Sequence, residues 1–367
     1  MLAATLAAAM ALGAQAQPIG QTELQSRVET ALAENELVAL GAAVAAVGEA
    51  PIVAVAGQTA KEGDTTALPE HAWHIGSNTK ALTALLYARL VEDGKAKWGA
   101  TMPDLFPSLA DSIDPAWNDI TIEDLFAHQS GAGQVGALWL ISRHNDSAQL
   151  TDQRLETARS RLTAPPKSEP GVFEYSNLNY IIAGAAIEQM LGMSWEDAMQ
   201  AYVFGAESSN WAEGWGFGPP ADIEGHKRGM FGGMKSVGHG PGADNPQALG
   251  PAGTAHAPLA SHAKLLLKFV DNDSALMTDE TREHLLMPWP DETADYAMGW
   301  GIREDADAGT LYLHNGSNTM WLSRVALVPE HGAVIIVNTN EFSDASMKAT
   351  QTVLEDLIDV VASDAQQ

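Results

Sequence analysis

The sequence predicts an α+β fold in which one antiparallel sheet is built from both termini, is flanked by helices, and carries an inserted, mostly helical region. Three observations predict it. Strand-type segments occur near both ends, apolar residues at helical spacing dominate the middle, and a stretch rich in Gly, Pro and Trp precedes the C-terminal strands. We therefore expect a sheet-and-helix domain at residues 17–93 plus 254–367, and a mostly helical region with Gly-rich loops at residues 94–253.

The N-terminal elements follow from local spacing. Apolar residues at helical spacing predict a helix at residues 21–37. Two β-rich runs, at residues 38–47 and 52–56, predict a hairpin on which this helix packs. A strand-like stretch at residues 73–76 then leads into an apolar helix at residues 80–90, which we expect to be buried.

The middle of the chain shows helical periodicity as far as about residue 205. The predicted helices lie at residues 121–128, 149–162, 179–191 and 194–204. From residue 205 to residue 253 the periodicity disappears, which predicts long loops. Loops of this length usually carry function or move.

The C-terminal part is predicted to be an antiparallel meander between two helices. The helices lie at residues 258–270 and 345–361. The β-rich runs between them are separated by turn residues and lie at residues 297–302, 310–314, 321–328 and 333–338.

The composition limits the classes of function. The chain has 367 residues, 46% of them hydrophobic and 18% charged, as in a soluble globular protein. Its net charge of −27 argues against nucleic acid as a partner, because phosphate binding needs clustered cations. There is no cysteine, which excludes disulfides, Cys-ligated zinc and thiol nucleophiles. His226, His239, His256 and His262 lack helical His-x-x-x-His spacing, so we expect no metal and no other cofactor.

The first 16 residues are predicted to be a signal peptide. Residues 2–12 are apolar but too short to span a bilayer, and Ala14-Gln15-Ala16 matches a small-residue cleavage site. This favours export to the periplasm or outside the cell. One feature disagrees, because the first basic residue is Arg27; the alternative is an Ala-rich tail. No other apolar run is long enough to be an integral membrane segment.

Ser77 and Lys80 form a Ser-x-x-Lys motif at the predicted strand-to-helix junction. The spacing places both side chains on one helical face, near the positive end of the helix dipole. A buried neutral lysine can take the proton of a serine and so activate it as a nucleophile. Ser261 and Lys264 repeat the spacing inside a predicted helix, where we expect them to be solvated, so the motif alone is weak evidence. Two further motifs distinguish Ser77. They are Tyr175-Ser176-Asn177 and His314-Asn315-Gly316.

With these three motifs the chain resembles the serine β-lactamase-related family, which includes class C β-lactamases, D-Ala-D-Ala carboxypeptidases and family VIII esterases. The similarity extends from about residue 21 to residue 360. Supporting stretches are ITIEDLFAHQSG at residues 120–131, PGVFEYSNLNY at residues 170–180 and HNGSNTMWLSRVALVPE at residues 314–330. The resemblance implies a β-lactamase/transpeptidase-like fold.

The resemblance also implies roles for the first two motifs. Ser77 would be the acyl-accepting nucleophile, with Lys80 as its proton partner. Tyr175 would share the base role, either with a lowered pKa or in concert with Lys80. Asn177 would bind the substrate amide or ester and hold Lys80. The alternative is structural: Tyr175 as a half-buried aromatic residue, and Asn177 as a helix N-cap.

The third motif bears on the substrate. By resemblance, the backbone N–H groups of Ser77 and Ser317 form the oxyanion hole, and Gly316 permits close backbone approach. His314 and Asn315 occupy positions that help to bind a substrate carboxylate in the family. Because Asn315 brings no charge and His314 is mostly neutral unless its pKa is raised, we expect neutral esters or amides instead. The alternative for His314 is a structural strand histidine.

These observations predict a serine hydrolase that acts through an acyl-enzyme on a small-molecule ester, amide or peptide, of the esterase or D-amino-acid peptidase type. A β-lactamase is the alternative within the same chemistry. A non-catalytic, cell-wall-binding pseudoenzyme is the alternative of another class, and the complete Ser, Lys, Tyr and Asn set argues against it.

Overall fold

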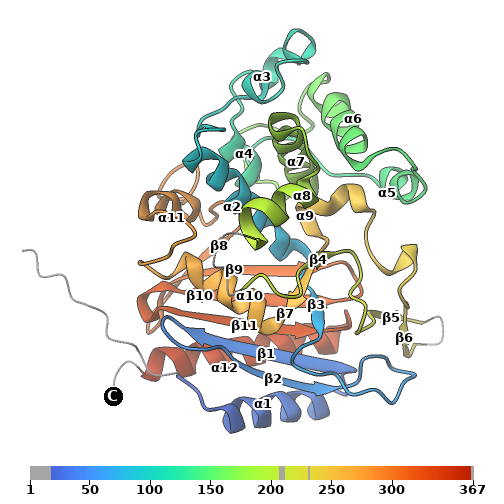
Figure 1. Ribbon diagram of the computed structural model, residues 1–367, viewed down its shortest axis with the longest axis vertical. Helices are drawn as coiled ribbons and strands as arrows, with labels where there is room; N and C mark the ends of the chain where they lie inside the picture. The colour runs from blue at the N-terminus through green and yellow to red at the C-terminus, as the bar shows by residue number, and fades with distance from the viewer. Residues whose placement is uncertain (1–17, 206–210, 230–231, 365–367) are drawn as a thin grey trace, which may run out of the picture.

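A computed structural model describes residues 18–205, 211–229 and 232–364 (Figure 1). The predicted signal peptide, residues 1–16, lies outside these ranges. No helix within them is both long enough and apolar enough to cross a membrane.

The sheet that the sequence predicts from both termini is present. It has six antiparallel strands in the order β2-β1-β11-β10-β9-β8, in the lower half of Figure 1. β1 pairs with β11, with Leu40 opposite Thr339, so the two ends of the chain meet in the middle of the sheet. The strands are β1 (Ala39–Ala46), β2 (Ile52–Gly57), β8 (Gly301–Asp305), β9 (Gly309–Ser317), β10 (Leu322–Val328) and β11 (Ala333–Thr339).

Helices cover both faces of the sheet. α1 (Gln21–Glu34) and α12 (Asp344–Asp364) pack on one face, and α10 (Leu259–Leu266) packs on the other. β11 is buried along its whole length, which explains its nearly continuous apolar sequence AVIIVNT. Its alternate residues belong to two cores: Ile335 contributes to the core beneath α1 and α12, and Ile336 to the core on the opposite face.

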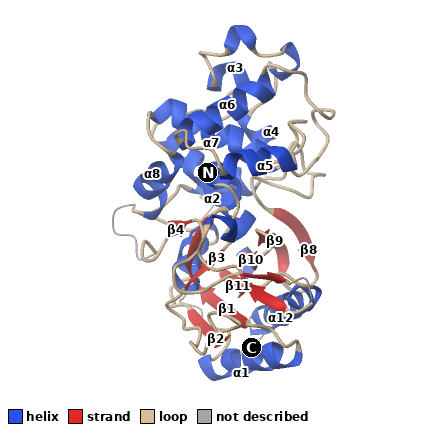
Figure 2. Cartoon of the chain, turned by 90° about the vertical axis from the view of Figure 1, so that its right-hand side faces the viewer, coloured by secondary structure: helices blue, strands red, loops and turns tan. Residues whose placement is uncertain are grey.

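The inserted region is a cluster of helices above the sheet (Figures 1 and 2). Its helices are α3 (Met102–Leu105), α4 (Ile122–Phe126), α5 (Ala137–His144), α6 (Leu150–Leu162), α7 (Asn177–Leu191) and α8 (Trp195–Met199), followed by a short π-helix, η4 (Gln200–Phe204). α7 begins at an N-cap, Ser176, whose hydroxyl accepts from the Leu178 N–H, and it ends at Gly192 in the left-handed conformation. α7 and α2 (Thr79–Glu92), the helix that leads into this region, are buried along most of their lengths. The exact division at residues 93 and 254 stays a prediction.

The structure contains helices that the sequence analysis did not predict, and it places one strand differently. α3, α5 and α11 (Asp279–Leu286) were not predicted. The strand expected at residues 297–302 instead begins at Gly301. Gly299 adopts a φ of 88°, and a Cβ on it would lie 2.7 Å from backbone atoms of Ala81 in α2. The apolar residues around Gly299 are therefore buried in a tight turn against α2 rather than in a strand.

The segment from residue 205 to residue 253 is less irregular than predicted. Its described part contains β4 (Gly216–Phe217), the hairpin of β5 (His226–Arg228) and β6 (Met234–Ser236), two 3₁₀ turns, η5 (Pro241–Ala243) and η6 (Gln247–Leu249), and the single helical turn α9 (Gly250–Gly253). β4 joins β7 (Ala255–Pro258) and β3 (Ala72–His74) in a second, three-stranded sheet. These elements are too short to show hydrophobic periodicity.

Candidate active site

Ser77 lies at the strand-to-helix junction that the sequence predicts. It is the middle residue of a single 3₁₀ turn, η1 (Gly76–Asn78), between β3 and α2. Gly76 has a φ of 53°, and its N–H donates to His74 Nδ1 at 3.1 Å. The turn is therefore sharp because glycine accepts the left-handed conformation, and it presents a partly exposed Ser77 at the start of α2.

Lys80 is fully buried one turn after Ser77. Its Nζ donates to Ser77 Oγ at 2.9 Å, to Asn177 Oδ1 at 2.7 Å and to the Ala252 carbonyl at 2.7 Å. Burial lowers the pKa of Lys80 well below its ordinary value. The lysine is therefore placed where its neutral form can take the Ser77 proton.

Tyr175 lies beside both Ser77 and Lys80. The residue is 36% exposed, but its hydroxyl end is buried and hydrogen-bonds with the Ser77 side chain. Burial raises the pKa of Tyr175 to about 12, and the hydrogen bond with Ser77 offsets this only in part. Lys80 Nζ lies 4.9 Å from the ring centre. Of the two roles considered for Tyr175, the structure favours action in concert with Lys80, because the phenol stays protonated.

Asn177 is the first residue of α7, and the cap of that helix is Ser176. The structural alternative that made Asn177 the N-cap is therefore wrong. With Ser176 satisfying the Leu178 N–H, the side chain of Asn177 is available to bind Lys80.

Gly316 brings β9 into backbone contact with η1. A Cβ on Gly316 would lie 2.9 Å from the Ser77 nitrogen and would overlap the Ile75 carbonyl. A Cβ on Gly76 would likewise overlap the Ser317 nitrogen. The backbone N–H groups of Ser77 and Ser317 are thus held close together by two glycines that face each other.

His314 is buried and its two ring nitrogens have partners. Nδ1 lies 3.1 Å from Asn78 Oδ1, and Nε2 lies 3.1 Å from the Tyr296 hydroxyl. Burial, and then the nearby Lys80, lower the pKa of His314 to about 3. His314 is therefore neutral near pH 7 and brings no charge to the site.

Asn315 does not lie at the site, contrary to the prediction that it helps to bind substrate. Successive side chains of a strand point to opposite faces, so Asn315 faces away from His314, toward α12. There its Oδ1 accepts from Arg324, whose guanidinium also donates to Thr350 Oγ1 and the Met347 carbonyl. The second position of the third motif is thus part of the packing between sheet and helix.

The second Ser-x-x-Lys pair lies in α10, as predicted, but Ser261 is buried in that helix rather than solvated. Within the described ranges no group of three or more His, Asp or Glu residues is arranged to hold a metal ion. Three of the histidines considered as ligands bond backbone carbonyls instead. They are His226 with Asn340, His239 with Pro220, and His256 with Gly218.

The family model described as Beta-lactamase matches residues 24–358. The chain belongs to the beta-lactamase family.

Curated relatives of this beta-lactamase family chain match parts of it. Esterase EstB of Burkholderia gladioli is 29% identical over 190 residues, which are 49% of this chain and 48% of the esterase. Penicillin-binding protein 4 of Amycolatopsis lactamdurans is 25% identical over 190 residues, which are 51% of this chain and 47% of that protein. Unguisins hydrolase ungD' of Aspergillus campestris is 30% identical over 137 residues, 35% of this chain and 24% of the hydrolase. The chain spans less than half the length of each of these relatives.

Solved structures share the fold over nearly the whole chain. D-amino acid amidase from Ochrobactrum anthropi SV3, complexed with L-phenylalanine amide, has a TM-score of 0.73 at 18% identity and covers 94% of this chain and 98% of its own. A beta-lactamase from Sulfitobacter sp. EE-36 has a TM-score of 0.72 at 20% identity and covers 93% of this chain and 99% of its own. These likenesses establish the β-lactamase/transpeptidase-like fold.

The site of this beta-lactamase family member includes residues that the sequence analysis missed. His128, fully buried with a φ of 61°, accepts the Ser176 N–H at Nδ1 and packs its ring 4.4 Å from that of Tyr175. The Tyr296 hydroxyl forms a hydrogen bond with His314 Nε2. The Ala252 carbonyl accepts from Lys80. Only His128 had a sequence signal, because it lies within the supporting stretch at residues 120–131.

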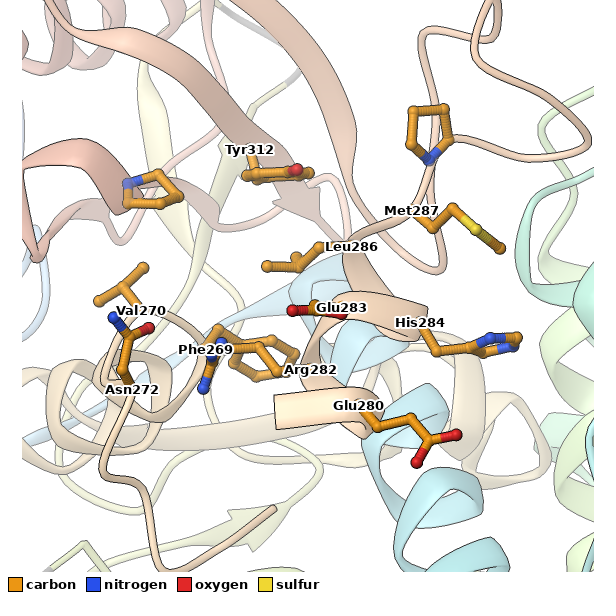
Figure 3. A pocket seen from close by; sticks show the side chains of 12 residues that line it. Phe269, Val270, Asn272, Glu280, Arg282, Glu283, His284, Leu286, Met287 and Tyr312 are labelled. Carbon is orange, nitrogen blue, oxygen red and sulfur yellow. The ribbon is translucent and has the colours of Figure 1, made fainter. Parts of the chain in front are cut away.

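A cavity of about 550 Å³ lies elsewhere (Figure 3). Its lining includes Phe269, Leu286, Met287 and Tyr312, together with the carboxylates of Glu280 and Glu283, and none of the residues predicted for the site. This cavity is therefore separate from the hydrogen-bonded cluster around Ser77.

Proposed function

We propose that the protein is an exported serine hydrolase that cleaves neutral esters or amides through an acyl-enzyme on Ser77. The observation that carries the proposal is the 2.9 Å contact between Lys80 Nζ and Ser77 Oγ, with Lys80 buried. Two of the relatives are named an esterase and a hydrolase, which supports the same class of reaction. Export rests on the sequence of residues 1–16.

In this mechanism neutral Lys80 accepts the proton of Ser77 as Oγ attacks the substrate carbonyl. The negative charge on the carbonyl oxygen develops against the N–H groups of Ser77 and Ser317, and losing one such donor typically costs about 100-fold or more in rate. The protonated Lys80 returns the proton to the leaving oxygen or nitrogen, with the Tyr175 phenol as the relay between them. Water then attacks the acyl-enzyme, its proton passes to the same groups, and Ser77 is restored with release of the acid.

The electrostatics around Ser77 favour a neutral substrate. His314 is uncharged, since burial holds its pKa near 3. Arg324 is on the Asn315 side of the sheet and is bonded there. Neither group supplies the positive charge that capture of a substrate carboxylate would use. A β-lactamase, whose substrates carry such a carboxylate, is the second candidate, supported by the relative named penicillin-binding protein 4.

The proposal is tested by covalent labelling with a fluorophosphonate, followed by mass mapping of the modified peptide. We expect one adduct, at Ser77, which is lost in Ser77→Ala. Ser261→Ala is the matched control, because it removes the serine of the other Ser-x-x-Lys motif and should leave the labelling intact. A folded wild-type protein that takes no label would support the non-catalytic alternative.

Substrate class is then resolved by turnover. We expect hydrolysis of p-nitrophenyl esters or of D-amino-acid amides to exceed hydrolysis of nitrocefin. Rapid nitrocefin turnover would favour the β-lactamase.

A further inference from the structure

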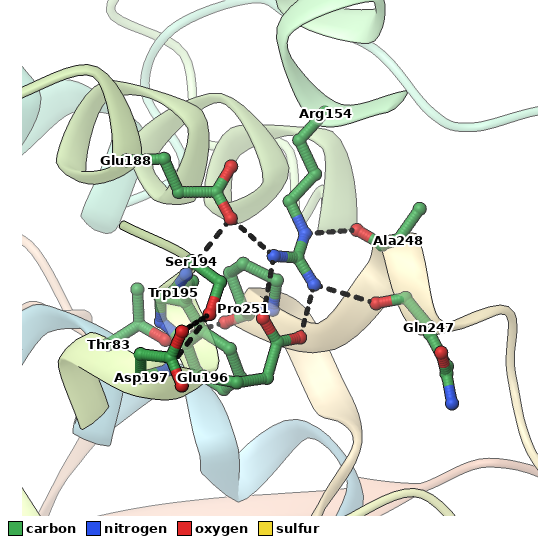
Figure 4. Close-up of polar contacts among 10 residues, drawn as sticks. All are labelled: Thr83, Arg154, Glu188, Ser194, Trp195, Glu196, Asp197, Gln247, Ala248 and Pro251. Carbon is green, nitrogen blue, oxygen red and sulfur yellow. Dashed lines mark hydrogen bonds and ion pairs between the residues drawn. The ribbon is translucent and has the colours of Figure 1, made fainter. Parts of the chain in front are cut away.

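Arg154 is a fully buried arginine in α6, and its guanidinium contacts several elements that pack around it (Figure 4). It donates to Glu188 Oε1 at 2.6 Å in α7 and to both carboxylate oxygens of Glu196, at 2.5 and 3.0 Å, in α8. Nε and NH2 donate to the backbone carbonyls of Ala248 at 3.1 Å and Gln247 at 2.8 Å. One side chain thus fixes two helices and the turn η6 relative to α6.

Such a network is weak evidence for stability in itself. Taking three charges out of water costs several kcal/mol per ion, and well-packed apolar residues of similar size are often as stable. A buried arginine with five directed donors is better suited to hold backbone groups in one position than to add stability.

The segment that Arg154 holds leads to Lys80. After Gln247 and Ala248 the chain forms α9, in which the Pro251 carbonyl accepts from Thr83 Oγ1 at 2.8 Å. The next carbonyl, of Ala252, accepts from Lys80 Nζ at 2.7 Å. The last carbonyl that accepts from Arg154 and the one that accepts from Lys80 are therefore only four positions apart in the chain.

Residues 247–253 are packed so closely against their neighbours that a movement at one end of the segment moves the other end. A Cβ on Gly250 would lie 2.8 Å from Arg154 NH2, and a Cβ on Gly253 would lie 3.5 Å from the Ser77 nitrogen. A Cβ on Gly184 of α7 would overlap the Pro251 ring. A shift of the 247–253 backbone therefore moves atoms that touch η1 and Lys80 directly.

The Ala252 carbonyl determines where the Lys80 lone pair points. A neutral amine has two N–H groups and one lone pair. When Asn177 Oδ1 and the Ala252 carbonyl accept the two N–H groups, the remaining direction faces Ser77 Oγ, 2.9 Å away. If the Ala252 carbonyl moves, the amine can turn and its lone pair no longer faces the Ser77 proton.

We propose that Arg154 is a positioning residue for the reaction: it fixes the backbone of residues 247–252, so that the Ala252 carbonyl aims the Lys80 lone pair at Ser77. The inference rests on the proposed function of Ser77 and Lys80.

The position of the 247–253 segment also affects the pH dependence of the reaction. The titratable groups that face Lys80 are Tyr175 and Tyr180, with ring centres 4.9 and 5.5 Å from Nζ, and the neutral His128 and His314. None of these supplies a negative charge, and burial is what depresses the Lys80 pKa. Loosening the 247–253 segment admits water to Lys80 and weakens that depression.

The test is the rate of fluorophosphonate labelling at Ser77, measured from pH 5 to pH 10 in Arg154→Lys. The lysine keeps a positive charge between Glu188 and Glu196 but cannot also reach both carbonyls of η6. We expect labelling slowed by up to about 100-fold, as for a misplaced catalytic group, and an acid limb shifted to higher pH. Arg161→Lys is the matched control: Arg161 also lies in α6 and donates to backbone carbonyls, of Ala164 and Pro165, outside the 247–253 segment. It should lower only the melting temperature.

Thr83→Val is the second variant. It removes the hydrogen bond to Pro251 without leaving a buried charge unpaired, so it decides the matter if Arg154→Lys does not fold. We expect it also to slow labelling and to raise the pH of the acid limb. The folded variants could instead keep the wild-type rate and pH midpoint while Ser77 of the wild type is still labelled. That result would overturn the role of Arg154 and leave the proposed function standing. An unlabelled wild type would instead overturn the proposed function.

Discussion

The backbone nitrogen of Ser77 lies so close to Gly316 that a methyl group on the glycine would be 2.9 Å from it. The two residues are far apart in the sequence, yet their contact sets the spacing of the two N–H groups proposed to bind the oxyanion. The geometry depends on the absence of a side chain at one position of β9.

Gly316→Ala should abolish this arrangement. The added methyl group overlaps the Ile75 carbonyl, so β9 must move away from η1 and the two N–H groups separate. We expect the rate of ester hydrolysis to fall by about 100-fold or more, the cost of one lost oxyanion donor. Gly301→Ala in β8 is the matched control, because its methyl group would meet the Leu313 carbonyl oxygen at 3.4 Å and Tyr296 Cδ2 at 4.0 Å without overlapping either. Equal rate losses in both variants would contradict the assignment.

Lys80→Arg should remove the base and place a permanent cation beside Ser77. A guanidinium stays protonated at every working pH, so it cannot take the Ser77 proton. We expect labelling of Ser77 to slow by roughly 100- to 10,000-fold. In the wild type the rate should fall as Lys80 becomes protonated, at a pH well below the ordinary lysine pKa, because burial lowers that pKa. Lys264→Arg, in the other Ser-x-x-Lys motif, should change nothing; a labelled, active Lys80→Arg would show that another group is the base.

Tyr175→Phe should slow the reaction without moving its pH midpoint. Because burial raises the pKa of Tyr175 to about 12, its phenol stays protonated through the neutral range and contributes no titration there. We expect a loss of about 100-fold in kcat/KM and the same acid limb as the wild type. An acid limb that disappears with the phenol would mean that Tyr175 itself titrates as the base.

Asn315→Ala should leave catalysis unchanged. The side chain bonds Arg324 on the face of the sheet that α12 covers, so its loss removes one exposed hydrogen bond, worth about 1 kcal/mol or less. Melting temperature and the labelling rate of Ser77 are the measurements. A large rise in KM would instead show that Asn315 helps to bind the substrate.

His262→Leu should make the protein more tolerant of acid. His262 is fully buried in α10, neither ring nitrogen has a hydrogen-bond partner among the described residues, and burial lowers its pKa to about 3. The unfolded chain therefore binds this proton below about pH 6.5 while the folded chain does not, so stability is present above that pH and is lost as the pH falls. From pH 7.5 to pH 5 the loss from this group is roughly 2 kcal/mol. Urea unfolding at both pH values should show a smaller loss in the variant.

The parts of the fold that the sequence predicts are those in which burial leaves a periodic pattern. β11 is apolar from Ala333 to Val337 because both its faces are covered, and α7 has a serine cap and a C-terminal glycine. α5 was missed because none of its residues is buried, and Leu138 and Ile141 are exposed on it. Ala297 and Met298 are as apolar as a strand, and only the positive φ of Gly299 shows that they form a turn.

The site residues that the sequence predicts are likewise those that leave a pattern in the sequence. Ser77, Lys80, Tyr175 and Asn177 were predicted because their side chains form short motifs, and the structure brings them together. Asn315 was misplaced although the alternation of a strand already separates it from His314. The Ala252 carbonyl was missed because a backbone acceptor has no residue-type signature, and it lies 172 positions from Lys80 in the chain.

The pairing of β1 with β11 also constrains how the chain reaches its native state. Leu40 of β1 pairs with Thr339 of β11, and β1 leaves the ribosome long before β11 does. Until β11 has been made, one edge of β1 has no partner strand. Closing a loop of that size makes such contacts slow to form. The hairpin of β1 and β2 thus exposes an unpaired strand edge during synthesis. With this topology, we expect the chain to depend on chaperones, and we expect it to aggregate when β11 is truncated.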